Sequence, residues 1–133
     1  MTSELTWEQA KSETQAMERE IVELIPADLV TEVDQFPTGS LLSCDADTHS
    51  WTGRSVVAVA PGTNLDETLA LIADHYEQQG VTVAKDTDVN GDARVQLQFS
   101  NGANYLISHD AVPRQLNISS GSPCFTLPEG VYP

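Results

Sequence analysis

The amino-acid sequence predicts an α+β fold: an antiparallel β-sheet of about five to six strands, with two helices packed on one face. Two segments carry apolar residues at helical spacing, and the second half of the chain alternates apolar and polar residues with a period of two. An Asn-Gly pair, typical of a tight hairpin, separates two of the alternating runs. In this class the strands are connected to one another by short turns, and the helices are separate from them. The 133 residues suit a single globular domain over 1–133.

The first helix is expected over about residues 6–25. Thr6 and Gln9 fit a capping box, in which each side chain bonds the backbone N–H of the other residue. Apolar or small residues then recur in steps of three and four as far as Leu24. Pro26 ends the pattern, because the residue before a proline avoids helical geometry. We interpret the apolar stripe as a core-facing surface.

A transitional stretch from 27 to 39 precedes the α+β body, which is expected over about 40–127. Strands are predicted at 40–44 and at 51–60, because both segments are rich in strand-forming residues. The polar run 45–50 between them is predicted to be a loop. The two strands would therefore form a hairpin with a long tip.

The second helix begins after Asn64, which is a favoured N-cap residue, and Gly80 is placed to end it. From position 81 the apolar period changes to two, and four short strands are predicted before the end of the chain. Asn101 and Gly102 form the turn between the second and third of these strands. The order is therefore helix, two strands, helix and four strands, with the last four arranged as an antiparallel meander.

Cys44 and Cys124 are the only cysteines, and they are separated by 80 positions without a metal-ligand spacing. This pattern predicts one structural disulfide, which would stabilise the fold by roughly 4–5 kcal/mol on the chain-entropy model. Disulfides are typical of oxidising compartments, so we expect an extracytoplasmic protein. The alternative is a reduced cytoplasmic protein with two incidental cysteines.

The charge distribution excludes several classes of partner. Six basic and 20 acidic residues give a net charge of −14, which repels nucleic-acid phosphates and anionic lipid surfaces. No apolar run approaches the ~20 residues of a transmembrane helix. The residues after Met1 have neither the basic start nor the apolar stretch of a signal peptide, so an extracytoplasmic location implies that an export signal has been removed.

The predicted hairpin tip is the candidate binding site. It places His49, Trp51 and Arg54 close together, and aromatic and arginine side chains supply much of the energy at interaction sites. The alternative is that Trp51 covers the edge of the sheet and Arg54 pairs with a nearby acid. We expect no catalytic residues and no cofactor. A small hydrolase would instead need the fold to bring one of the three histidines, at 49, 75 or 109, beside a carboxylate.

Residues 86–91 copy the first six positions of a calcium loop, with oxygen-bearing side chains at alternate positions and a closing glycine. The twelfth position, where such a loop needs a bidentate glutamate, is Leu97. We therefore expect no tight calcium site and interpret the segment as a polar turn built on Asn90 and Gly91. No other metal site is expected.

Four short motifs together resemble those of small secreted lipoproteins of actinobacteria. The motifs are Leu-Leu-Ser-Cys at 41–44, Trp-Thr-Gly at 51–53, Asp-x-Asn-Gly at 88–91 and Ser-Pro-Cys-Phe at 122–125. The resemblance implies a signal peptide and a lipid-modified cysteine upstream of this sequence, and pairing of Cys44 with Cys124. It offers no catalytic residues.

From these observations we expect a non-enzymatic binding or interaction domain at the cell envelope. Its partner would be an envelope protein or a small ligand. Two alternatives remain. One is a small envelope hydrolase that uses histidine and carboxylate residues, and the other is a secreted inhibitor or immunity-type protein with a concave acidic face.

Overall fold

A computed structural model of the chain describes residues 6–110 and 112–127. Within them, two α-helices, a short 3-10 helix and one eight-stranded sheet are present. The elements in chain order are α1 (Trp7–Glu23), η1 (Ala27–Leu29), β1 (Val30–Gln35), β2 (Ser40–Ser43), β3 (Thr48–Val59), α2 (Leu65–Gln78), β4 (Thr82–Thr87), β5 (Ala93–Gln98), β6 (Asn104–His109), β7 (Gln115–Gly121) and β8 (Phe125–Thr126). All strand pairs are antiparallel, and the order across the sheet is β1-β3-β7-β6-β5-β4, with β2 and β8 also paired to β3.

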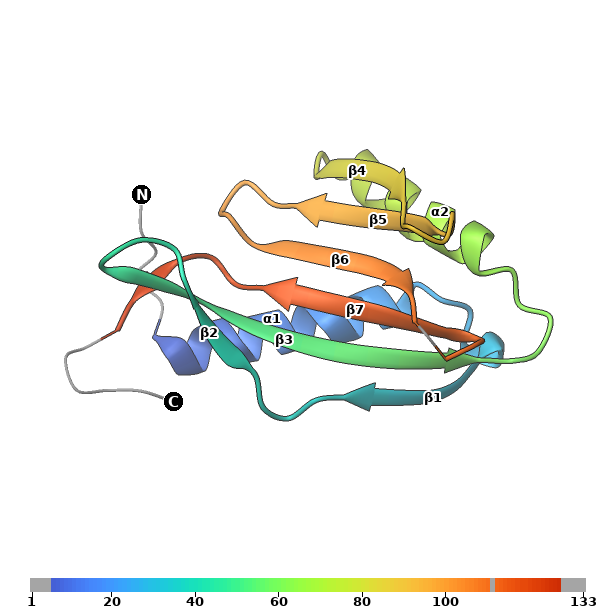
Figure 1. Cartoon of the computed structure of the whole chain (residues 1–133), viewed down its shortest axis with the longest axis horizontal. Helices are drawn as coiled ribbons and strands as arrows, with labels where there is room; N and C mark the ends of the chain where they lie inside the picture. Colours follow the sequence, from blue (N-terminus) through green and yellow to red (C-terminus); the bar gives the residue numbers. More distant parts are fainter. Residues whose placement is uncertain (1–5, 111, 128–133) are drawn as a thin grey trace.

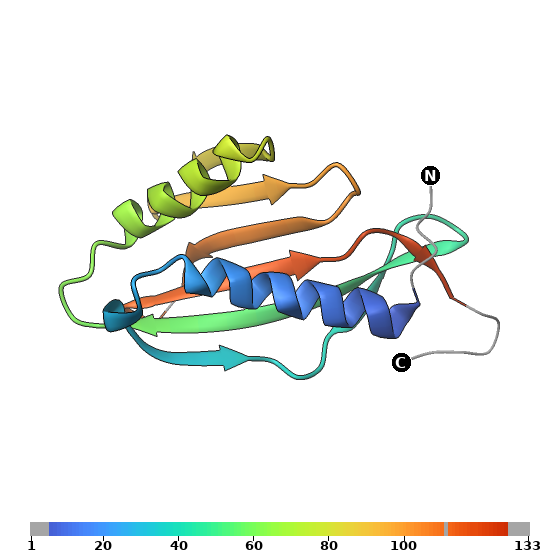
Figure 2. The same cartoon turned by 180° about the vertical axis from the view of Figure 1, so that it is seen from behind.

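Both helices lie on the same face of the sheet, which confirms the predicted α+β class (Figures 1 and 2). Helix α1 crosses β3 and β7, whereas α2 covers β4, β5 and β6. The main core lies between these layers and contains Ile21 of α1, Ile72 of α2 and Ile107 of β6. Neither described helix has both the length and the apolar composition of a membrane span.

The local signals for the helix ends are confirmed. The Thr6 Oγ1 accepts the backbone N–H of Gln9, and the Gln9 side chain accepts the N–H of Thr6. The Asn64 side chain accepts the backbone N–H of Glu67 at the start of α2. Gly80 follows α2 with a φ of +85°, a left-handed conformation that glycine adopts without a steric penalty.

The predicted strand count was too low, because the stretch from 27 to 39 contains β1 and the chain end adds β8. Strand β1 pairs with β3 along the edge of the sheet, and most of its side chains are exposed. An exposed edge strand needs no apolar alternation, since its backbone bonds come from its neighbour. Strand β8 has only two residues. It forms because Thr126 pairs with Thr48 of β3, which is far away in the sequence.

The predicted polar loop 45–50 is also wrong in its bounds. Strand β3 begins at Thr48, and the turn between β2 and β3 covers only residues 44–47. The Asp45 carboxylate fixes this turn by accepting hydrogen bonds from the backbone N–H of Asp47 and from the N–H and hydroxyl of Thr48. These bonds hold the pKa of Asp45 below its usual value, with a minor contribution from the charge of His49.

Candidate functional site

The structure places Trp51 in the interior, so the predicted exposed aromatic anchor is wrong. Its side chain is only 2% exposed and packs in a second core cluster with Ala10 of α1 and Phe125 of β8. Its indole also lies over Gly53, where an added Cβ would approach the ring to 2.4 Å. Trp51 therefore fastens the first turns of α1 to the sheet, which corresponds to the alternative weighed for this residue.

Arg54 lies on the opposite face of β3 from Trp51, because successive side chains of a strand point to opposite faces. Its side chain is 44% exposed. The guanidinium donates to Asn117 Oδ1 and to Asp110 Oδ1, the latter at 3.3 Å, and lies 5.2 Å from the centre of the Phe36 ring. The predicted pairing of Arg54 with a nearby acid is therefore present.

His49 does not join Arg54 in a common site. It is half-buried near the start of β3, where it pairs in register with Phe125 of β8. The three residues predicted at the tip are thus distributed between the interior, the sheet end and the far face of the sheet. The prediction failed because residues 49–54 form part of a strand rather than a loop.

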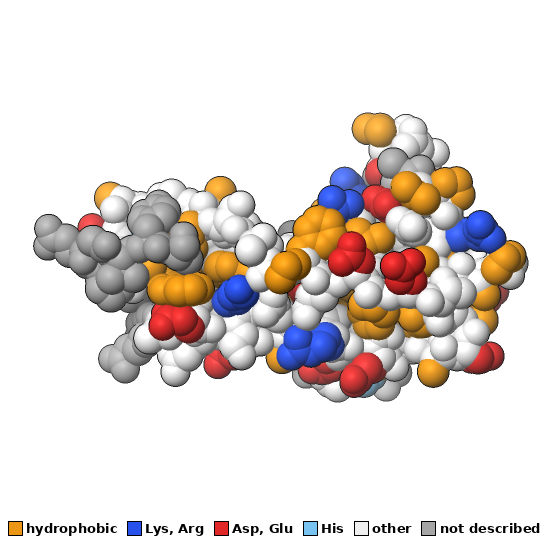
Figure 3. Space-filling view, turned by 90° about the horizontal axis from the view of Figure 1, so that it is seen from below, with side chains coloured by type: hydrophobic (Ala, Val, Ile, Leu, Met, Phe, Trp, Pro, Cys, Tyr) orange, Lys and Arg blue, Asp and Glu red, His pale blue; other side chains and the backbone are white. Residues whose placement is uncertain are grey.

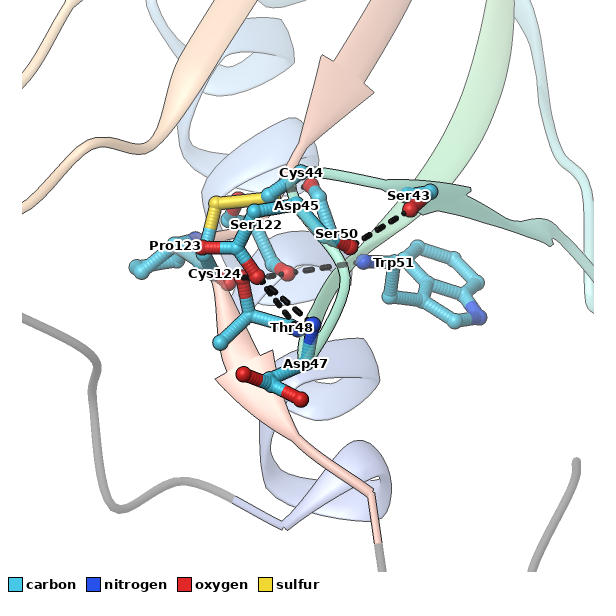
Figure 4. Close-up of a disulfide and its surroundings, with 10 residues drawn as sticks. All are labelled: Ser43, Cys44, Asp45, Asp47, Thr48, Ser50, Trp51, Ser122, Pro123 and Cys124. Carbon is cyan, nitrogen blue, oxygen red and sulfur yellow. Dashed lines mark hydrogen bonds between the residues drawn. A yellow bond between two sulfur atoms is a disulfide. The ribbon is translucent and has the colours of Figure 1, made fainter.

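Cys44 and Cys124 form the predicted disulfide, with a Cα–Cα distance of 6.4 Å (Figure 4). The bond joins the turn after β2 to the segment before β8. Beside it, the backbone N–H of Trp51 donates to Ser122 Oγ, and the Ser50 hydroxyl donates to the Ser122 carbonyl at 2.7 Å. In Figure 4 the indole of Trp51 points away from the disulfide.

The side of the sheet opposite the helices carries no described helix, although β2 crosses in front of β3 at one end, and we call this side the open face (Figure 1). It consists of Thr52, Arg54, Val56 and Ala58 on β3; Gln115, Asn117 and Ser119 on β7; Asn104, Leu106 and Ser108 on β6; and Arg94, Gln96 and Gln98 on β5. These positions alternate with the buried residues under the helices, as the pleat of a sheet requires.

The open face differs in charge from the rest of the molecule. None of its side chains is acidic, although the chain has 20 acidic residues. Carboxylates occur only at its rim, on Glu32 and Asp34 of β1, on Asp86 of β4 and on Asp110 after β6. Figure 3 views the molecule from below, from the β1 side, and shows acidic, basic and apolar side chains intermixed along this edge.

Three adjoining hollows mark the open face. The largest, of about 440 Å³, is lined by residues that include Leu42, Thr52, Gln96, Asn104 and Leu106. A second, of about 210 Å³, lies toward β1, and its lining includes the carboxylates of Glu32, Asp34 and Asp110. The third, also of about 210 Å³, lies between the loop before β2 and Arg54. Arg54 lines the first and third hollows, so it stands at the centre of the candidate surface.

A smaller groove of about 170 Å³ lies on the helical side, between α1 and the β5–β6 hairpin. Met17, Phe99 and Tyr105 supply much of its lining. Tyr105 is 3% exposed, and burial raises the pKa of its phenol well above the usual value, as do the charges of nearby glutamates. The groove is narrower than the open face and belongs to the packing of α1 against the hairpin.

Beneath the open face, α1 places a carboxylate in the interior. Glu18 is 1% exposed and accepts hydrogen bonds from the hydroxyls of Ser55 and Ser120 and from the amide of Gln35. The donors come from β3, β7 and β1, so one side chain bonds three neighbouring strands. This network satisfies a buried polar group and is structural in character.

One of the three histidines lies beside a carboxylate, as the hydrolase alternative requires. His109 Nε2 lies 2.9 Å from Asp66 Oδ1, but neither residue lines any of the hollows above. His75 contacts Gln79 on the surface of α2. Residues 6–110 and 112–127 contain no cluster of three or more metal-ligating side chains.

In the calcium-like segment the oxygens already have partners. Both carboxylate oxygens of Asp86 accept from Arg94, and Asp88 Oδ1 accepts the backbone N–H groups of Asn90 and Asp92. Leu97 is fully buried in the core. The segment is therefore a polar turn closed by side chains of the chain itself, in agreement with the interpretation of the sequence.

Sequence reasoning did not identify the open face. A signal for it is present, because the outward polar positions of these strands include amides and hydroxyls, such as Gln96, Gln98 and Asn117, and no acidic residue, in a chain with 20 acidic residues. What the sequence does not supply is the strand order that brings these positions together.

The chain matches no protein-family model, no curated protein and no solved structure.

Proposed function

We propose that this protein is an extracytoplasmic binding domain of the cell envelope and that the open face is its binding surface. The observation that carries the proposal is the uncovered sheet face itself, which combines a hollow of about 440 Å³ with apolar and hydrogen-bonding side chains and has no carboxylate on its four central strands. Concave surfaces of this mixed chemistry are typical of ligand sites.

The location is supported by the disulfide, since such bonds persist in oxidising compartments. Attachment through a lipid-modified cysteine upstream rests on the resemblance to secreted lipoproteins. The location is tested in cells of the source organism by blocking free thiols before lysis. Protection of Cys44 and Cys124 from the blocking reagent supports export, whereas modification of both contradicts it.

The binding surface is tested by a comparison of matched variants. The wild-type protein is immobilised and incubated with envelope extract, and the retained components are compared with those retained by Leu106→Arg/Ser119→Arg. Both residues line the largest hollow. The control is Ser12→Arg/Ala16→Arg, which adds the same two positive charges on the exposed surface of α1. Loss of a component by the open-face variant alone supports the proposal, and equal retention by all three proteins contradicts it.

The other two functions have less support. A hydrolase requires a nucleophile or an activated water beside a histidine–carboxylate pair, and the His109–Asp66 pair has no hydroxyl or thiol among its partners in the described residues. An inhibitor with a concave acidic face would need its carboxylates in the main hollow. Glu32, Asp34 and Asp110 line the smaller hollow toward β1, whereas the largest hollow has no carboxylate. The neutral, polar character of the face therefore favours ligand binding.

A further inference from the structure

The open face presents an array of amide side chains that the protein does not use. Within the described residues, the side chains of Gln96, Gln98 and Asn104 make no hydrogen bond to other protein groups. Gln98 and Asn104 are directly opposite each other on β5 and β6, and Gln96 is opposite Leu106. Neighbouring strands are about 4.8 Å apart, so these three amides lie close together on the surface. Each amide can both donate and accept hydrogen bonds.

The charge of the array indicates what it can bind. A cationic ligand would bind beside Glu32, Asp34 and Asp110 in the smaller hollow toward β1, and not at the amides, because no carboxylate lines the largest hollow. An anionic ligand would be repelled by the net charge of −14, and both arginines of the open face are already neutralised, Arg54 by Asp110 and Arg94 by Asp86. The groups that remain match a ligand that is uncharged and rich in hydroxyls.

The floor of the largest hollow adds an apolar component. Leu106 lies between Gln96 and Ser119 in the sheet, and Leu42 is 62% exposed at one end of the hollow. A sugar ring has hydroxyls around its edge and C–H groups on its faces. Such a ring can place its C–H face against leucine while its hydroxyls reach the surrounding amides.

We propose that the open face binds a neutral carbohydrate chain, laid across β3, β7, β6 and β5. This inference rests on the proposed function, because it assigns a ligand class to the same surface. A protein partner is less consistent with the face, since interface cores are enriched in aromatic side chains and the four central strands present none on this side.

The test uses nuclear magnetic resonance of the isotope-labelled protein with four neutral oligosaccharides: maltohexaose, cellohexaose, laminarihexaose and chitohexaose. At least one should shift the side-chain amide signals of Gln96, Gln98 and Asn104 in a saturable manner. The variant Gln96→Ala/Asn104→Ala should bind that oligosaccharide about tenfold more weakly. The control Ser12→Ala, on the exposed surface of α1, should bind like the wild type.

Several outcomes would overturn the inference: no shift with any of the four sugars, shifts confined to the helical side, or equal affinity of the double variant. The failure of the inference is distinguishable from that of the proposed function. If an envelope component is retained through the open face and proves to be a protein or a charged ligand, the carbohydrate inference fails and the binding function stands. If Leu106→Arg/Ser119→Arg changes no interaction, both fail.

Discussion

At the scale of single residues, the most consequential side chain is Trp51. Aromatic residues are large enough to dominate the packing of a small core, and this one joins α1, β3 and β8 in one cluster. The close approach of its ring to Gly53 leaves no space for a larger residue there. Trp51 therefore contributes to the stability of the fold, and its side chain is not part of the open face.

Replacement of Trp51 by alanine should lower the free energy of unfolding by about 3–5 kcal/mol, because it removes a buried aromatic side chain and leaves a cavity. Chemical denaturation of Trp51→Ala measures this loss. Trp7 is only half-buried in the same cluster, so Trp7→Ala is the matched control and should cost less. A loss at position 51 no larger than that at position 7 would contradict the core role.

Asp45 makes the stability depend on pH through the turn at 44–47. Its pKa is lowered in the folded state, chiefly by the hydrogen bond from the Asp47 backbone. A group with a lowered folded pKa contributes stability above its unfolded pKa, near 3.8, and loses it as the pH falls through the folded pKa.

The variant Asp45→Asn should therefore be less stable than the wild type at neutral pH, and the difference should shrink as the pH falls below 3.8 and through the lowered folded pKa of Asp45. Thermal unfolding across this pH range measures the effect. Asp47→Asn is the control, since the Asp47 carboxylate accepts none of the hydrogen bonds of the turn. A difference between wild type and Asp45→Asn that is independent of pH would contradict the assignment.

At the scale of elements, α1 is positioned by polar as well as apolar contacts. The Glu18 carboxylate meets hydroxyls of β3 and β7 where the helix crosses the sheet. A buried carboxylate is tolerated only when its hydrogen bonds are satisfied, so its donors must be in place when the helix docks. Glu18 therefore favours one placement of α1 over others that would bury the same apolar surface.

Glu18→Leu should destabilise the protein by about 1–3 kcal/mol, because it leaves the hydroxyls of Ser55 and Ser120 buried without their acceptor. The triple variant Glu18→Leu/Ser55→Ala/Ser120→Ala removes both sides of the network and should recover much of the loss. Urea denaturation of the two variants and of the surface control Glu23→Ala tests this. A triple variant less stable than the single one would show that the network is not the cause.

The turn between β4 and β5 remains predicted not to bind calcium tightly. Asp86 would have to leave Arg94, and position 12 of the loop is a buried leucine. Calorimetric titration with calcium should show no binding in the micromolar range. A one-to-one isotherm that is absent from Asp88→Ala would contradict this prediction, and Asp92→Ala would then show whether the neighbouring carboxylate takes part.

At the scale of the whole molecule, the disulfide connects parts that are 80 residues apart and lie at one end of the sheet (Figure 1). It fastens β8 next to β3, where strand pairing itself is only two residues long. The segment that carries Phe125 into the second core cluster is therefore held by a covalent bond as well as by packing.

The double variant Cys44→Ser/Cys124→Ser should be less stable by about 4 kcal/mol, because the open chain regains the entropy of a long loop. Denaturation of the wild type with and without a reductant gives an independent value for the same loss. Thiol titration of the unfolded, unreduced wild type should find no free thiol. Two reactive thiols per chain would contradict both the bond and the inferred compartment.

The sequence by itself determined the fold class, both helices, the meander from β4 to β7 and the cysteine pairing. The cysteine pairing follows from the presence of only two cysteines in the chain. The helices and the meander depend on local chemistry: the Thr6–Gln9 capping box, the Asn64 cap, a period of two and a tight Asn101-Gly102 turn. Such signals lie within a few residues of the structure that they specify, so they can be recognised without knowledge of the rest of the chain.

The tertiary structure alone decided the extent of β3, the presence of β1 and the position of the candidate site. Residues 48–50 are polar and favour a loop locally, but they form a strand because β2 and β8 supply backbone partners from elsewhere in the chain. Once 49–54 is a strand, its period of two separates Trp51 from Arg54. The strand order then places Arg54 and the amides of β5 and β6 around one hollow, because pairing between distant segments sets which side chains share a surface.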